Sequence, residues 1–398
     1  MFTLVKKNLK LKNIVKDAII LVLLLTCIGE GVVIGTGAFG ASDGIASTRK
    51  LQQIKGAIDK YYLEDVDDEK LEEYTYKGLV AGLNDPYSTY YTKEEYEEVS
   101  ESNSGVFSGI GAVIQQDADT GECKVVRTIS DSPAQKAGVK AGDVIYKIDG
   151  KEVSASDDLS NVVSKVKGKE GTKVKITFLR DQKEKTFTIT RKKIETPTVE
   201  SEMLDNKVGY IQITQFEEVT VQQFQDALNH LEQNGMKKLV LDLRDNPGGL
   251  LTSVVQISDM ILPKGTIVYT KDKNGKKEEY NATTDEKVDV PIAVLVNGNS
   301  ASASEILAGA IQDYGAGTLV GTTTFGKGIV QNIMKMSDGS ALKLTISKYY
   351  TPKGRNIHKK GIKPDVEVKL KESLQDKSEI SKEEDNQLQK AISVLKEK

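Results

Sequence analysis

Apolar and polar positions follow different rhythms in successive parts of this chain of 398 residues. Over 47–99, apolar side chains recur every three to four positions, which predicts amphipathic helices. Over 102–192, short apolar runs are bounded by glycines, which predicts strands and tight turns. After residue 193, strand-like runs alternate with longer helical segments. Because such alternation brings parallel strands together under covering helices, the later part predicts an α/β core.

The expected elements follow from these rhythms. In the middle region we predict a helix at 156–165 and strands at 109–115, 123–129, 143–148, 173–179 and 185–191. In the later region we predict helices at 221–233, 251–261 and 304–312 and strands at 208–213, 238–243, 266–270, 292–296 and 318–320. The charged stretch 271–289 is assigned no element, and a helix is expected at 386–395.

These elements divide the chain into five parts. We predict an N-terminal signal-anchor segment at 1–40, a helical arm at 41–99, a β-rich domain at 100–192, an α/β core at 193–370 and a helical tail at 371–398.

The N-terminus has a basic flank, since five lysines lie between positions 6 and 16, ahead of an apolar stretch at 18–39. A basic flank before an apolar core is typical of export signals, with the positive end kept in the cytoplasm. The stretch is long enough for the ~20 residues that a bilayer requires. We therefore expect a single-pass protein of the cell membrane whose later domains are extracytoplasmic. Cleavage near 37–42, which would release a secreted protein, is the alternative.

The composition mainly excludes several classes of partner, cross-link and cofactor. A formal net charge of −3 argues against a nucleic-acid partner, because binding to phosphates requires a basic surface. Two cysteines, Cys27 and Cys123, cannot form a disulfide framework. No clustered metal-ligand motif and no dinucleotide fingerprint occurs in the sequence, so we expect neither a metal nor a cofactor.

The two histidines offer little support for a catalytic triad. His230 lies in a predicted helix, where a packing or surface role is the usual one, and His358 lies in a basic stretch where we expect exposure. The segment 321–328 fits the GxxxxGK pattern of a phosphate-binding loop. That loop requires Ser or Thr after the lysine and a helix beyond it. Here a glycine follows Lys327 and the next residues look extended, so we do not expect nucleotide hydrolysis.

Ser302 lies in an unusual run of three serines between a predicted strand and a predicted helix. With Glu305 it forms the S-x-x-E pattern of a capping box, in which the hydroxyl only satisfies a helix N–H. A second interpretation is catalytic, since N–H groups at a helix N-terminus can hold an oxyanion beside a serine nucleophile. A glycine of the turn 245–249 can supply a further N–H. The residues alone leave both interpretations open.

A serine nucleophile needs a base, and lysine can serve when its amine is neutral. Because free lysine titrates near ~10.4, the amine must be kept away from water and from carboxylates. Phe325, Ile329 and Val330 provide apolar surroundings for Lys327, and 322–333 contains no acidic residue.

Gln331 is a suitable partner for such a lysine, because its amide oxygen accepts a hydrogen bond without adding negative charge. Side chains four positions apart meet on a helical turn but stand ~13 Å apart along a straight strand. A contact between Gln331 and Lys327 therefore predicts coiled chain at 327–331.

Three segments carry a resemblance to a known family: the run Asn299–Asp313, the stretch 321–331 and the closing stretch 350–365. Together they resemble the carboxyl-terminal processing proteases, also called tail-specific proteases. The resemblance implies that Ser302 is the nucleophile, that Lys327 is the base and that Gln331 steadies the lysine. It also implies an oxyanion hole formed by the N–H groups of Gly248 and Ala303.

The middle region is similar to a PDZ domain through its run 132–150. Four residues stand where the carboxylate-binding loop of that domain would be: Ser108, Gly109, Ile110 and Gly111. Glycine-rich N–H groups can hold a terminal carboxylate while the bound peptide adds as a strand. The resemblance therefore implies protein or peptide partners with free C-termini.

Taken together, the sequence predicts a serine endopeptidase with an α/β protease core, in which a mostly parallel sheet is flanked by helices. A PDZ-like β-rich domain and an N-terminal helical arm precede this core. We expect substrates to be recognised through their C-terminus, the PDZ domain to gate activity, and the chain to form a homodimer through its arm and tail. The alternative is a non-catalytic PDZ scaffold that keeps the fold.

Overall fold

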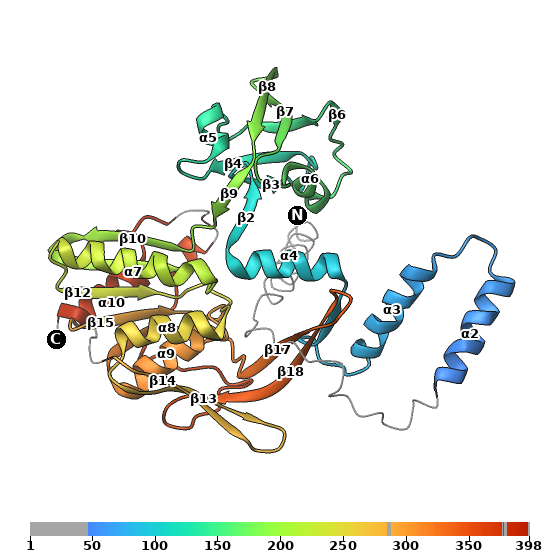
Figure 1. The fold of residues 1–398 in the computed structure, drawn as a ribbon. Helices are drawn as coiled ribbons and strands as arrows, with labels where there is room; N and C mark the ends of the chain where they lie inside the picture. Colours follow the sequence, from blue (N-terminus) through green and yellow to red (C-terminus); the bar gives the residue numbers. More distant parts are fainter. Residues whose placement is uncertain (1–46, 285–287, 376, 378–379, 397–398) are drawn as a thin grey trace, which may run out of the picture. The chain divides into compact units, whose positions relative to one another are not determined.

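The computed structural model describes residues 47–284, 288–375, 377 and 380–396 (Figure 1). The apolar stretch 18–39, our predicted membrane anchor, lies outside the described residues. Within the described part of the chain, no helix has both the length and the apolar character needed to cross a bilayer. The chain forms two compact units: residues 104–198 make the smaller one, and the flanking segments together make the larger one.

The smaller unit is built mainly of antiparallel strands, as the short glycine-bounded runs predicted. Its main sheet has the order β3-β4-β5-β7-β8, with β6 added to β5, and β2 pairs separately with β9. The strands are β2 Val106–Gly109, β3 Ala112–Gln116, β4 Cys123–Thr128, β5 Val144–Ile148, β6 Lys151–Glu152, β7 Lys173–Arg180, β8 Lys183–Thr190 and β9 Lys192–Glu195. The helices are α5 Pro133–Ala137 and α6 Leu159–Val166.

The predicted strand 109–115 is interrupted in this unit, because β2 ends at Gly109 and β3 begins at Ala112. Gly111 separates them with a φ of +76°. A side chain at Gly111 would lie 2.3 Å from the Cβ of Ser132, so only glycine fits this close approach. The interruption leaves a short glycine-bounded loop at 110–111.

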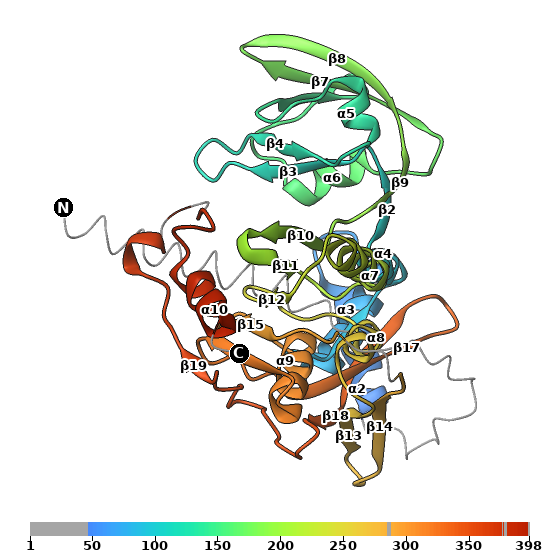
Figure 2. The same ribbon diagram turned by 90° about the vertical axis from the view of Figure 1, so that its left-hand side faces the viewer.

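The larger unit contains a six-stranded sheet of order β10-β11-β12-β15-β16-β19, parallel except for the pairing of β10 with β11 (Figure 2). Its strands are β10 Val199–Leu204, β11 Val208–Ile213, β12 Lys238–Asp242, β15 Ile292–Val296, β16 Gly317–Gly321 and β19 Val366–Glu367. Its helices are α7 Glu218–Gln233, α8 Leu251–Ile261, α9 Ala303–Tyr314 and α10 Asn386–Lys396, with short 3₁₀ turns at Asp205–Lys207 and Glu372–Leu374. This arrangement confirms the predicted α/β core.

Both faces of this sheet are covered. Ile211, Leu241 and Val294 pack with helices α7, α8 and α9 in one apolar cluster, whereas Tyr210 and Leu295 pack with α10 in another. Successive side chains of a strand point to opposite faces, so a strand buried on both sides is apolar throughout. This explains the continuous apolar runs of the central strands.

A second sheet in the larger unit was not predicted. It is antiparallel, with the order β1-β18-β13-β14 and with β17 paired to β18. The strands are β1 Thr89–Tyr91, β13 Gly265–Asp272, β14 Lys277–Ala282, β17 Ile329–Lys335 and β18 Ala341–Tyr350. β14 lies in the charged stretch that we assigned no element, and most of its side chains are exposed. An exposed edge strand need not carry an apolar pattern, which explains why the sequence did not reveal it.

The described part of the N-terminal arm contains three helices, α2 Ser47–Tyr61, α3 Asp68–Ala81 and α4 Lys93–Ser104. The arm is not wholly helical, because β1 lies within it and pairs with β18 (Thr89 with Lys343, Tyr91 with Ala341). The smaller unit is therefore inserted, along the chain, into the larger one.

Candidate active site

Ser302 is the N-cap of α9, at the carboxyl end of the parallel sheet, where the sequence predicted a helix start. Its backbone angles are φ 53° and ψ −112°. A non-glycine residue rarely adopts this region and does so mainly where the surrounding structure enforces it, as at the sharp strand-to-helix turns that expose a nucleophile. The predicted capping box with Glu305 is also present. The capping interpretation of Ser302 is thus structurally correct, and it is compatible with the catalytic one.

The three serines of this segment have different environments. The Ser300 hydroxyl donates to the Leu243 carbonyl at 2.7 Å, and the Ser304 hydroxyl donates to the Asn246 carbonyl at 3.0 Å. Both residues are fully buried. Among the described residues, the Ser302 hydroxyl makes no such donation to a carbonyl. Ser302 is therefore the serine of this run whose proton is available for transfer.

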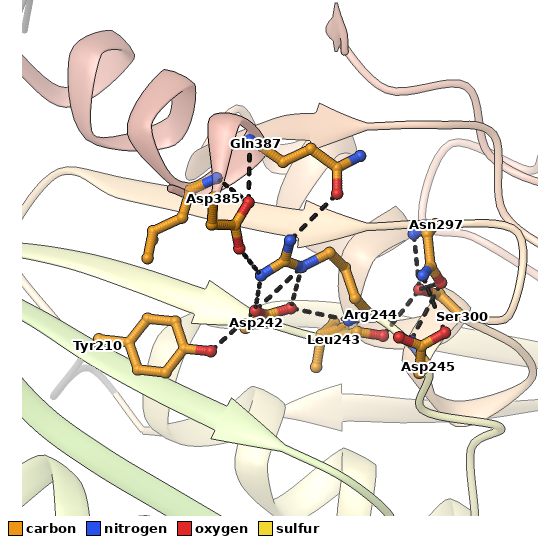
Figure 3. Close-up of polar contacts among 10 residues, drawn as sticks. Tyr210, Asp242, Leu243, Arg244, Asp245, Asn297, Ser300, Asp385 and Gln387 are labelled. Atoms are coloured by element: carbon orange, nitrogen blue, oxygen red, sulfur yellow. Dashed lines mark hydrogen bonds and ion pairs between the residues drawn. The ribbon is translucent and has the colours of Figure 1, made fainter. Parts of the chain in front are cut away.

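Polar contacts fix the two loops that meet at this edge of the sheet (Figure 3). Asp245 binds the Asn297 side chain at 3.0 Å and the Asn299 side chain at 2.7 Å. Beside them the Arg244 guanidinium lies between the buried carboxylates of Asp242 and Asp385. Arg244 thereby links the end of β12 to the start of α10. These bonds hold the 244–249 turn against the loop that carries Ser302.

Gly248, the predicted oxyanion residue, lies directly against the serine. A Cβ at Gly248 would stand 2.8 Å from the Ser302 Cβ and 2.9 Å from the Ala303 nitrogen. Its φ of +106° is a second reason for glycine at this position. The Gly248 N–H donates to the Asn246 side chain at 2.8 Å in this structure. Gly248 and Ala303 are therefore adjacent to Ser302, and the Gly248 N–H must exchange its present acceptor to bind an oxyanion.

The Glu305 carboxylate joins the serine and the lysine segments. It is fully buried and accepts four hydrogen bonds. One oxygen accepts from the N–H groups of Ser302 at 3.0 Å and Lys327 at 2.8 Å, and the other accepts from the Thr324 hydroxyl at 2.5 Å and the Gly326 N–H at 2.8 Å. Burial raises the pKa of Glu305, and these hydrogen bonds partly oppose that effect. Sequence reasoning assigned Glu305 only its capping role.

Lys327 is 1% exposed and lies just before β17. Within the described part of the chain, its amine has no hydrogen-bond partner. The amine lies 4.8 Å from the centre of the Tyr87 ring. Phe325, which we expected to help cover the amine, is 41% exposed. The aromatic cover comes instead from Tyr87, which is far away in the sequence.

The coiled chain at 327–331 that a contact between Gln331 and Lys327 would require is not formed, and the Lys327 amine makes no hydrogen bond to Gln331 in this structure. Ile329–Lys335 forms β17, paired antiparallel with β18, and the pairing shifts register between Val330 and Gln331. The ladder of hydrogen bonds to β18 holds this segment extended, and it outweighs any local tendency to coil. Gln331 is 3% exposed, and its side-chain nitrogen donates to the Thr345 hydroxyl at 3.1 Å. The same extended path supports the exclusion of a phosphate-binding loop, because no helix follows Lys327.

The expectation that His358 is exposed is also wrong. The residue is half-buried, and a side chain at Gly328 would stand 2.5 Å from its backbone nitrogen. Burial, followed by the charges of Lys359 and Lys348, lowers the pKa of His358. His230 is exposed on α7, as a surface histidine would be.

The smaller unit has a groove at the predicted carboxylate-binding loop. A cavity of about 280 Å³ is lined by Gly109, Ile110 and Gly111, by Ile114 of β3 and by Val163 of α6, among others. Ser108 lies in β2 beside the loop and is not among the lining residues. The groove is therefore lined mainly by apolar residues of β3, α6 and the glycine-containing loop.

Comparisons with known proteins agree with this arrangement. Peptidase family S41 matches residues 207–368, the PDZ domain matches 106–190, and the N-terminal domain of the activating protease CtpB matches 36–95. The chain is 41% identical over 367 residues to the carboxy-terminal processing protease CtpA of Bacillus subtilis (strain 168), covering 92% of this chain and 78% of that protein. The chain belongs to the S41 family of carboxy-terminal processing proteases.

Other members of the family extend this picture. A protein of Staphylococcus aureus (strain MSSA476) with the name "Probable CtpA-like serine protease" is 40% identical over 81% of this chain, and the chain spans 65% of that protein. A crystal structure of an S41 protease from Bacteroides fragilis NCTC 9343 shares the fold, with a TM-score of 0.51 and 16% identity over 85% of this chain and 93% of that one. The chain is thus a serine-type C-terminal processing peptidase with a PDZ domain, and the predicted class of enzyme is confirmed.

Proposed function

We propose that Ser302 is the nucleophile of this peptidase and that Lys327 is its general base. The observation that carries the proposal is the buried Glu305 carboxylate, one oxygen of which binds the backbone N–H groups of both residues. This shared acceptor holds the two backbones together across the site. The Lys327 side chain is buried, and its amine has no hydrogen-bond partner among the described residues.

Peptide cleavage then follows the usual course of acyl transfer. The neutral Lys327 amine takes the Ser302 proton while the serine oxygen attacks the scissile carbonyl carbon. The resulting ammonium returns the proton to the departing amine, and an acyl-enzyme remains on Ser302. Water, deprotonated by the same lysine, releases the new C-terminus.

The N–H groups of Gly248 and Ala303 are proposed to bind the oxyanion that forms during this attack. Their support is position, because Gly248 lies against both Ser302 and Ala303. Ala303 is the first residue of α9, where the N–H groups of a helix are free of intrahelical partners. Binding requires the Gly248 N–H to leave the Asn246 side chain.

The test is cleavage of an unfolded protein by the variants Ser302→Ala and Lys327→Ala. Each should lower kcat/KM by at least about a thousand-fold while the melting temperature stays close to that of the parent. Ser300→Ala serves as a matched control, because its hydroxyl is engaged with a backbone carbonyl. Wild-type activity in either catalytic variant would reject the assignment. A non-catalytic scaffold, the alternative function, requires that the parent itself cleave nothing.

For the PDZ domain we propose capture of substrate C-termini in the groove beside the 108–111 loop. The apolar lining suits an apolar terminal side chain, and the loop N–H groups suit the terminal carboxylate. Capture is further proposed to gate cleavage at Ser302. Matched peptides with free and amidated C-termini test this, because amidation should weaken both binding and cleavage. Equal rates for the two peptides would contradict it.

We also propose that the N-terminal segment anchors the chain in the cell membrane, with the catalytic unit extracytoplasmic. The support is the row of lysines followed by the apolar stretch 18–39. Recovery of the full chain in the soluble fraction, uncleaved, would contradict it.

A homodimer formed through the arm is supported by exposed apolar side chains there, including Leu51, Ile54, Leu79 and Leu83. Light scattering that gives a monomer mass would contradict this proposal.

A further inference from the structure

The region around Lys327 contains a hydrogen-bonded chain that the catalytic scheme above does not use. It begins at the turn before β1 and ends at the Gln331 side chain. The Ser88 hydroxyl donates to the Asp85 carboxylate at 2.6 Å, and the backbone N–H of Tyr87 donates to the same carboxylate at 3.1 Å. The Thr345 hydroxyl also hydrogen-bonds this carboxylate. Asp85 is therefore an acceptor for three separate donors.

The donor in each of these hydrogen bonds follows from which groups are able to donate. An ionised carboxylate only accepts hydrogen bonds, so the Thr345 hydroxyl must give its proton to Asp85. The oxygen of that hydroxyl is then left to accept, and it does so from the side-chain nitrogen of Gln331 at 3.1 Å. Asp85 is held in the ionised form, since its pKa is lowered. Burial alone would raise that pKa, but the hydrogen bonds from Ser88, Thr345 and Tyr87 oppose this effect.

The strand pairing places Thr345 where this contact requires it. Val330 pairs with Ser347, and the next residue of β17, Gln331, pairs with Thr345. One residue of β18, Ile346, is therefore passed over, and its side chain is 42% exposed. Without this bulge, Ile346 would stand opposite Gln331. Bulges re-aim side chains next to functional sites, and this one brings a hydroxyl to Gln331.

The turn is itself anchored to β18. The Thr345 N–H donates to the Ser88 hydroxyl oxygen at 3.0 Å, so Thr345 contacts the turn through both its backbone and its side chain. The same turn supplies Tyr87, whose ring faces the Lys327 amine. The short segment 85–88 thus supplies both the aromatic ring beside the Lys327 amine and the contacts that hold Thr345.

We propose that Asp85 and Thr345 are positioning residues that fix the side-chain amide of Gln331 so that its oxygen, and not its nitrogen, is presented to Lys327. An amide has a donor end and an acceptor end, and rotation by half a turn exchanges them. With the nitrogen held by Thr345, the oxygen is the end left to accept a hydrogen bond. The Lys327 amine has no hydrogen-bond partner in the described structure, so its bond to this oxygen belongs to the proposed working conformation. A rotated amide would present N–H groups to an amine and could not steady it. The inference rests on the proposed role of Lys327 and on the role that the family resemblance implies for Gln331.

The first test compares Thr345→Val with Thr345→Ser. Valine has nearly the shape of threonine but neither donates nor accepts, so the Gln331 amide loses its fixed orientation. We expect kcat to fall by about 10- to 100-fold with KM changed less than about two-fold. Serine keeps the hydroxyl and should stay within about three-fold of the parent kcat. Melting temperatures establish that each variant is folded. A Thr345→Val enzyme with the parent kcat would overturn the proposal.

Asp85→Asn tests whether the Thr345 hydroxyl must donate to residue 85. Asparagine can donate to Thr345, which allows the threonine hydroxyl to donate toward the amide and removes the preference for one orientation. We expect a fall in kcat similar to that of Thr345→Val. A parent-like kcat in this variant would also overturn the proposal.

A double-mutant cycle separates positioning from general stabilisation. In a Gln331→Ala background there is no amide left to orient, so adding Thr345→Val should lower kcat no further. The same loss in both backgrounds would show that Thr345 acts by another route. The outcome is independent of the dyad itself. If Lys327→Ala retained activity, the proposed function would fail, whereas an inactive Lys327→Ala beside a normal Thr345→Val would remove this inference alone.

Discussion

The two halves of the proposed dyad are supported in contrasting ways. Ser302 is positioned by neighbours in the chain, namely the helix that it caps and the Glu305 carboxylate three residues later. Lys327 is surrounded by distant segments, because Tyr87 faces its amine and the Thr345 N–H reaches Ser88 across 257 residues. The comparison teaches that a nucleophile can be recognised from local sequence, whereas the environment of its base depends on the tertiary fold.

Glu305 belongs to both halves, so changing it should have the largest effect. In Glu305→Gln one acceptor oxygen becomes an NH₂ group that faces two donors. We expect kcat/KM to fall by more than about 100-fold and the free energy of unfolding to fall by about 3 kcal/mol. Steady-state kinetics and denaturant unfolding measure the two losses. Glu232→Gln, at an exposed position of α7, is the control and should behave as the parent. Near-parental values for Glu305→Gln would show that the two halves are independent.

A methyl group at Gly248 tests the serine half alone. In Gly248→Ala the new Cβ would meet Ala301 and Ser302 atoms at 2.8 Å, and the φ of +106° adds strain. We expect about a 10- to 100-fold loss of kcat, because the backbone beside the nucleophile must shift. Gly235→Ala is the matched control, since its φ of +80° gives similar strain but nothing lies within 4 Å. The kinetic constants of the control should match the parent, and equal losses in both variants would assign the effect to backbone strain.

The smallest effect concerns stability near the serine half. Glu217 precedes α7, next to Phe216, whose backbone bonds Gly248 and Leu250. Burial raises the pKa of Glu217 to about 7, from an ordinary value of 4.5. The unfolded chain therefore loses this proton at lower pH than the folded chain does. Stability should fall as pH rises from about 4.5 to about 7, by roughly 1–3 kcal/mol.

In Glu217→Gln this part of the pH dependence should disappear. Unfolding midpoints measured at pH 5 and pH 8 give the comparison, and the difference between the two pH values matters more than either value alone. An unchanged difference in the variant would mean that Glu217 is ionised in the folded protein throughout this range.

Much of the fold could be predicted from the sequence. The strands Val208–Ile213 and Ile292–Val296 and the helix Leu251–Ile261 have the predicted limits, because their apolar runs face a core that covers them. The antiparallel sheet was missed for a physical reason. β14 is an exposed edge, and β1 has only three residues, so neither carries enough pattern to be recognised.

The candidate site shows the same division. The serine loop and the turn with Gly248 follow from helix capping and from glycine geometry, both of which are local. The cover over Lys327 and the contact between Gln331 and Thr345 depend on strand pairing and on a bulge in β18, which no spacing within 322–333 contains. That window has no acidic residue, yet Asp85 and Glu305 approach it in the folded protein.

The pairing of β1 with β18 has a consequence for any shortened version of this enzyme. A fragment that starts after residue 193 would retain Ser302, Lys327 and Gln331 in its sequence. It would lack the turn 85–88, which contacts the Lys327 amine and holds the threonine that binds Gln331. During synthesis, likewise, the active site remains incomplete until β18 has been made and has paired with β1. Competence for proteolysis is therefore acquired late, as a property of the whole folded chain.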